Sequence, residues 1–141
     1  HQNGTAAASA AEAAGLQGYW KQYADMLFAK QSEWGNASSS ERTALFDKYF
    51  LEVTDNKGDL DKFNQDIASK AVSKKISFDM DVGKKVNVGG TPAFYIDGQL
   101  INWSSSGHVT IDGKTVTWDS AKSGDEFVDL LKEIVNTKLE N

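Results

Sequence analysis

The stretch VGGTPAFYIDG, residues 88–98, holds the one proline of this 141-residue chain and stands where the sequence pattern changes. An average proline content of about 5% would give several. The peptide bond before a proline is the one kind whose cis form lies only about 0.5–1 kcal/mol above trans. Gly89 and Gly90 allow a sharp turn into Pro92. By themselves these residues are compatible with a rigid helix-to-strand connection, or with a loop that presents the Thr91 backbone to an extended partner peptide.

Upstream of this stretch, apolar residues recur at intervals of three and four, which predicts a series of helices whose apolar stripes form the core. The stripe residues of the first part are Leu16, Tyr19, Trp20, Tyr23 and Leu27, then Leu45, Phe46, Tyr49, Phe50 and Val53. The expected boundary residues are a Thr5 cap before the alanine-rich residues 6–14, Gly15 and Gly35 as stops, and a capping box of Ser38 with Glu41.

A further helix is expected to begin after a cap at Asp59. Its predicted buried face comprises Leu60, Phe63, Ile67 and Ala71, followed by Phe78, Val82 and Val86. Because the second group is out of phase with the first, we expect a kink or break between Ser73 and Ser77.

Downstream of Pro92 the apolar period changes from 3.6 to 2, which predicts two hairpins. Asp97-Gly98 and Asp112-Gly113 are the expected turns. A capping box of Ser123 with Glu126 then predicts a terminal helix. The fold class is therefore α/β.

The run AFYI, residues 93–96, is apolar at consecutive positions, as in a strand that is covered on both faces of a sheet. A single hairpin leaves one edge of such a sheet open, and an open apolar edge favours pairing with another strand. Either a further strand lies outside these residues, or the chain forms a homodimer through the exposed edge.

The amino-acid composition argues against several classes of function. Fifteen basic and 20 acidic residues give a net charge of -5 without a basic face, which argues against nucleic-acid binding. The absence of cysteine excludes disulfides and thiolate nucleophiles, and two distant histidines give no basis for a metal site or a cofactor. His108 is expected to face solvent. The chain begins at His1 without a signal-peptide pattern, as a mature product or an excised piece would.

Residues 88–98 closely resemble the cis-proline segment of DsbA-like thiol–disulfide oxidoreductases, which are thioredoxin-fold proteins with a helical insertion. Residues 6–34 and 61–76 are similar to the start and the last part of that insertion, and residues 125–134 to the final helix. The resemblance implies that residues 1–87 are the helical insertion. It implies that residues 88–141 are the C-terminal strand–strand–helix half of the fold, with an added hairpin near residues 104–118.

The same resemblance implies that Gly90, Thr91 and Pro92 bind extended polypeptide substrates, in a protein of the cell envelope or a secreted one that has a redox partner protein. The family's C-x-x-C motif and first strands have no counterpart here, so the chain looks truncated at the N-terminus and has no catalytic residue of its own. Two alternatives stay open. One is a non-redox peptide-binding or chaperone-like module of the same fold, and the other is its glutathione-transferase or isomerase branch.

Overall fold

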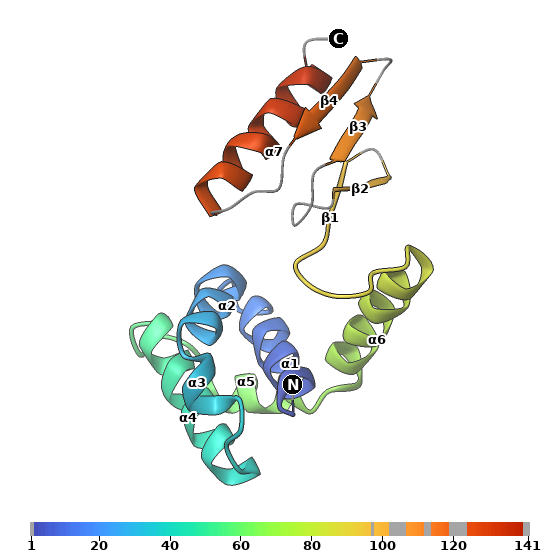
Figure 1. Cartoon of the computed structure of the whole chain (residues 1–141). Helices are drawn as coiled ribbons and strands as arrows, with labels where there is room; N and C mark the ends of the chain where they lie inside the picture. The colour runs from blue at the N-terminus through green and yellow to red at the C-terminus, as the bar shows by residue number, and fades with distance from the viewer. Residues whose placement is uncertain (1, 97, 102–106, 112–113, 119–123, 140–141) are drawn as a thin grey trace. The chain divides into compact units, whose positions relative to one another are not determined.

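The computed structural model describes residues 2–96, 98–101, 107–111, 114–118 and 124–139. The chain divides into two compact units, His1–Val86 and Asn87–Asn141 (Figure 1). The first unit is helical, and the second combines strands with one helix. Each unit has its own hydrophobic core.

The described part of the first unit consists of helices around α1 (Figure 1). Helix α1 packs against α2, α5 and α6, and α4 packs against α2, α3 and α5. Alanines on the buried face of α1 have almost no side-chain volume, which lets the neighbouring helices approach closely. The helices are α1 (Gly4–Gly15), α2 (Trp20–Ala29), α3 (Gln31–Trp34), α4 (Ser39–Val53), α5 (Leu60–Ile67) and α6 (Lys70–Lys85).

An aromatic cluster forms the centre of this unit. The rings of Phe50 and Phe63 stack with centroids 4.2 Å apart, and the ring of Tyr23 lies 5.5 Å from that of Phe63. All three side chains are fully buried. Such aromatic contacts add about 0.5–1.5 kcal/mol beyond the burial of apolar area. The predicted stripe of α4 is thereby confirmed, with Phe46 and Tyr49 buried as well.

Several predicted helix boundaries are confirmed. Ser38 and Glu41 form the capping box of α4, in which each satisfies a backbone N–H of the other. The Asp59 carboxylate accepts a hydrogen bond from the Lys62 N–H at 2.9 Å and caps α5. Gly35 directly follows α3.

Two boundary predictions are wrong. Helix α1 begins at Gly4, with Asn3 at the N-cap position, so Thr5 lies in the first turn and does not cap. The predicted break between Ser73 and Ser77 lies earlier, because α5 ends at Ile67 and a second cap at Ser69 starts α6. The new helix turns Ala71 outward, which explains why this residue is exposed and Val72 is buried.

Part of the predicted core stripes is exposed. On the segment around α2, Tyr23 and Leu27 are buried, but Leu16 and Trp20 are more than half exposed. On α6 the members Phe78, Val82 and Val86 are also exposed. Helical periodicity identifies the apolar face of a helix but does not say what covers that face.

The described part of the second unit contains two antiparallel hairpins and one helix. In the first hairpin, Phe94 pairs with Ile101 and Ile96 with Gln99, which confirms the predicted pairing. Gly98 has a φ of 74°, as the turn requires, while Asp97 lies outside the described residues. The elements are β1 (Phe94–Ile96), β2 (Gln99–Ile101), β3 (Gly107–Ile111), β4 (Lys114–Trp118) and α7 (Gly124–Leu139).

The second hairpin is also confirmed, with His108 opposite Thr117 and Val109 opposite Val116. Its turn, Asp112-Gly113, and the predicted cap Ser123 lie outside the described residues. The second unit combines strands and a helix, as the predicted α/β class requires, but its described strands pair only in antiparallel hairpins, and the described part of the first unit contains helices without strands. Among the described helices, none has the length and apolarity that crossing a membrane requires.

Candidate functional site

The segment that opens the second unit is a loop of residues 87–93 between α6 and β1. Helix α6 ends with Val86 as its C-cap, and Asn87 takes a left-handed backbone conformation with a φ of 57°. This reversal of the chain direction separates the helix from the glycines. The loop therefore belongs to the second unit alone.

The residues predicted to bind substrate lie together on the surface. Gly89, Gly90, Thr91 and Pro92 are all exposed, and the Thr91–Pro92 peptide bond is cis. A Cβ atom built on Gly89 or on Gly90 would meet nothing within 4 Å. These glycines therefore leave open space beside the loop, which a partner backbone could occupy.

The loop continues into a strand that is held by packing. The ring of Phe94 meets that of Phe127 edge to face, with centroids 4.8 Å apart. Ile101, opposite Phe94 on β2, is 1% exposed and packs with Leu130 and Ile134 of α7. Helix α7 thus covers one face of the hairpin, while Leu100 on the other face is 54% exposed. The strand that follows the exposed loop is therefore held by the packing of Phe94 and Ile101 with residues of α7.

The chain has no cysteine, and His108 is exposed on β3, as expected. Within the described ranges, no cluster of three or more His, Cys, Asp or Glu side chains is arranged to hold a metal ion. The exposed loop and the open space beside its glycines are compatible with binding another chain.

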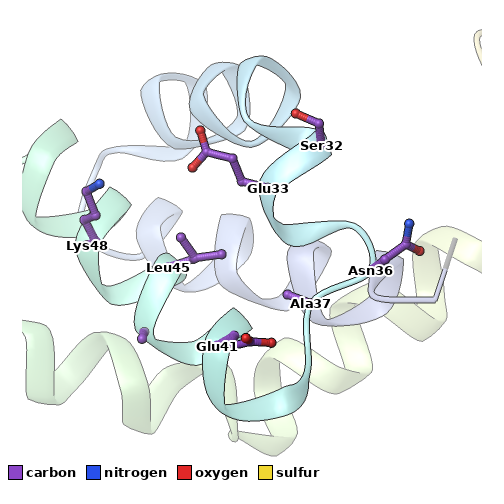
Figure 2. A pocket seen from close by; sticks show the side chains of 8 residues that line it. Ser32, Glu33, Asn36, Ala37, Glu41, Leu45 and Lys48 are labelled. Atoms are coloured by element: carbon purple, nitrogen blue, oxygen red, sulfur yellow. The ribbon is translucent and has the colours of Figure 1, made fainter.

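A separate polar hollow of about 620 Å³ lies in the helical unit, between α3 and α4 (Figure 2). Its carboxylates are already paired. Glu33 accepts hydrogen bonds from Lys30 at 2.9 Å and from the Tyr49 hydroxyl at 2.9 Å, and these bonds lower the pKa of Glu33. The Ser38 side chain and backbone likewise lower the pKa of Glu41. The carboxylates of Glu33 and Glu41 both stay ionised at neutral pH, and their hydrogen bonds stabilise the helical unit.

An apolar hollow of about 340 Å³ runs between α1 and α2. Small residues of α1, including Ala7 and Ala11, line it together with Trp20 and Phe28 of α2. Apolar periodicity placed Trp20 in the core, so this hollow was not predicted from the sequence.

Comparison with known proteins identifies the family. A family model described as thioredoxin matches residues 1–129. Over 102 residues the chain is 33% identical to the Na(+)/H(+) antiporter NhaA 1 of Salinispora arenicola, and over 99 residues it is 31% identical to NhaA 3 of Salinispora tropica. Each match covers 70% of this chain and 14% of the antiporter.

A shorter match of 46 residues is 39% identical to the probable disulfide bond formation protein D of Bacillus cereus, and it covers 33% of this chain and 21% of that protein. The chain thus spans only a minor part of the length of each of these relatives. No solved structure gives a significant match.

Proposed function

This chain belongs to the DsbA-like thioredoxin family, and we propose that it is the polypeptide-binding part of a protein thiol–disulfide oxidoreductase. The parent enzyme would form or isomerise disulfides in proteins of the cell envelope or in secreted proteins. Gly90, Thr91 and Pro92 would contact an extended substrate polypeptide. The similarity to a probable disulfide bond formation protein supports this assignment.

One observation carries the proposal. Residues 89–92 are exposed, and the space beside Gly90 is open. An extended peptide binds through its own backbone N–H and C=O groups, so it needs a partner backbone that no side chain shields. The glycine pair and the anchored strand β1 provide such a backbone.

Disulfide exchange itself requires a thiolate that attacks a disulfide sulfur and forms a mixed disulfide. None of the 141 residues is a cysteine, so this chain performs no such step by itself. Under the proposal, a C-x-x-C segment outside these residues supplies the two thiols. This chain would hold the substrate for exchange and would meet a redox partner protein only as part of the parent enzyme.

A second candidate is a non-redox peptide-binding or chaperone-like module. The absence of cysteine favours it, as does the similarity to segments of two proteins named as antiporters and not as redox proteins. The two candidates share the peptide site and differ only in the thiols. Their common part is therefore tested first.

Replacing Gly90 by Val should weaken peptide binding. The new side chain would enter the open space beside the loop, where it obstructs an approaching backbone, while its Cβ meets no other part of the chain within 4 Å. We expect about a tenfold loss of affinity, equivalent to about 1.4 kcal/mol. Fluorescence anisotropy of a labelled, cysteine-free extended peptide measures the effect.

The matched control is Ser77→Val, which adds a side chain of the same kind at an exposed position of α6, outside the loop. Both variants should unfold at close to the wild-type urea concentration. A Gly90→Val protein that binds as tightly as wild type, or a Ser77→Val protein that is equally impaired, would remove the loop from the proposed site.

The coding sequence that surrounds these 141 codons separates the candidates. An in-frame C-x-x-C segment supports the oxidoreductase, and its absence supports the non-redox module. For the oxidoreductase, the full-length protein should oxidise a reduced model polypeptide. Gly90→Val should slow that reaction without changing the number of titratable thiols.

A further inference from the structure

The dipeptide Asn3-Gly4 combines a chemically labile sequence with a side chain that the fold holds firmly. An asparagine followed by glycine is prone to deamidation, because glycine has no side chain to obstruct attack by its own backbone nitrogen. Asn3 is the one asparagine of the chain that precedes a glycine. Asparagines 36, 56, 64, 87, 102 and 136 precede residues larger than glycine, and Asn36, before Ala37, provides an internal reference.

The structure surrounds the side chain of Asn3 with hydrogen-bond partners. Its Nδ2 donates to the carbonyl oxygens of Trp34 at 2.8 Å, Ala37 at 3.0 Å and Gly35 at 3.3 Å. Its Oδ1 accepts from Nη1 of Arg42 at 2.8 Å. Asn3 is only 4% exposed. The side chain therefore ties the start of α1 to the segment between α3 and α4.

Deamidation requires the hydrogen bonds of the Asn3 side chain to break. The Gly4 backbone nitrogen attacks Cγ of Asn3 and loses its proton, ammonia leaves, and a cyclic succinimide forms. Water then opens the ring to give aspartate or isoaspartate. In the folded chain the side-chain amide is directed at residues 34–37, and the Asn3 carbonyl accepts the first helical hydrogen bond from the Ala7 N–H at 3.0 Å. Both interactions oppose the rotation that ring closure needs.

We propose that Asn3 is a deamidation site that is protected in the folded chain and becomes reactive when the helical unit opens. The product cannot restore the contacts. A carboxylate at this position has no N–H to donate and would place an anionic oxygen against the carbonyl oxygens of Trp34 and Ala37. Arg42 would still pair with the oxygen in the place of Oδ1, but not with the oxygen that faces these carbonyls. Isoaspartate would also insert an extra atom into the backbone immediately before α1. Each unfolding event therefore exposes Asn3 to a covalent change that disfavours refolding.

The test compares deamidation of the wild-type chain in mildly alkaline native buffer and in guanidinium chloride. Tryptic peptides are analysed by mass spectrometry, and isoaspartate is determined enzymatically. We expect Asn3 to react at least about tenfold more slowly in native buffer, since exchange-type reactions follow the population of the open state. Asn36 should change little under either condition. Equal rates for Asn3 in the two conditions would overturn the proposal, as would faster reaction at Asn36.

Two variants extend the test. Arg42→Ala removes one partner of Asn3, so it should accelerate deamidation in native buffer and leave the rate in denaturant unchanged. Ser77→Ala, an exposed change within α6, should alter neither rate. Asn3→Asp, which mimics one product, should unfold at a lower denaturant concentration than wild type. An unaltered native rate in Arg42→Ala, or an unaltered midpoint in Asn3→Asp, would contradict the proposed protection or its consequence.

Discussion

Gly58 and Gly90 are the same residue type in opposite surroundings. A Cβ on Gly58 would lie 2.6 Å from ring atoms of the buried Phe50 and 2.8 Å from Cγ2 of the buried Thr54, closer than atoms pack. A Cβ on Gly90 would meet nothing within 4 Å. Gly58 is thus required by the core, whereas Gly90 is not required by the fold of the chain.

Replacing Gly58 by Ala should therefore destabilise the protein by about 1–3 kcal/mol through overpacking. Gly90→Ala, the control with the same added atom, should stay within about 0.5 kcal/mol of wild type. Urea unfolding followed by circular dichroism compares the two. Equal stability of both variants would mean that the Phe50 ring yields freely, against the tight packing described for the core.

Tyr49 should make stability fall at alkaline pH. Burial, then the hydrogen bond to Glu33 and the charges of Glu33 and Glu52, raise the pKa of Tyr49 to about 12. An unfolded tyrosine ionises near pH 10. Between these values the unfolded chain loses the proton while the folded chain keeps it, so the stability that is fully present below pH 10 declines until pH 12.

The check is the difference between wild type and Tyr49→Phe. Over this pH range the wild-type free energy of unfolding should fall more steeply, by up to about 1.4 kcal/mol per pH unit. Tyr23, whose pKa is raised mainly by burial, is present in both proteins, so the effect of its burial contributes to both profiles. Parallel pH profiles would show that Tyr49 titrates alike in the folded and unfolded chains.

At the scale of elements, local chemistry determines where most helices begin. The side-chain oxygens of Ser38, Asp59 and Ser69 each accept a hydrogen bond from a backbone N–H in the first turn of the helix, and the first two caps were predicted from the sequence. The break at Ala68–Ser69 was predicted too late. Apolar periodicity places the break where the stripe changes phase, after Ser73, and gives no weight to the earlier cap residue Ser69.

Ser38→Ala should cost about 1 kcal/mol, because it leaves helical N–H groups of α4 without their side-chain partner. Ser77→Ala makes the same chemical change at an exposed position inside α6 and should stay within about 0.5 kcal/mol of wild type. Thermal or urea denaturation of the pair measures the difference. A loss of equal size in both variants would indicate that the capping box contributes nothing specific.

Which residues are buried in the core was harder to predict from the sequence than where the helices lie. Tyr23 and Trp20 belong to the same periodic stripe, yet Tyr23 is fully buried and Trp20 is 52% exposed. The Nε1 of Trp20 donates to the Glu12 carboxylate at 3.1 Å, which holds the indole against the last part of α1. Which apolar faces are covered depends on tertiary contacts that periodicity does not contain.

At the scale of the whole molecule, the sequence carried both the family and the location of the candidate site. The glycine pair before the single proline and the flanking helical blocks led to the DsbA-like family, to which the match over residues 1–129 assigns the chain. The open space beside Gly90 and the role of Phe127 in anchoring β1 required coordinates, because they depend on contacts between segments distant in sequence.

The most direct test of the central claim is an NMR titration of the isotope-labelled wild-type chain with a cysteine-free extended peptide. The account predicts that the amide signals of Gly89, Gly90 and Thr91 shift progressively with peptide concentration, while signals from α1 to α5 remain in place. Unchanged loop signals at saturating peptide, or shifts confined to the helical unit, would contradict a peptide-binding role for this loop.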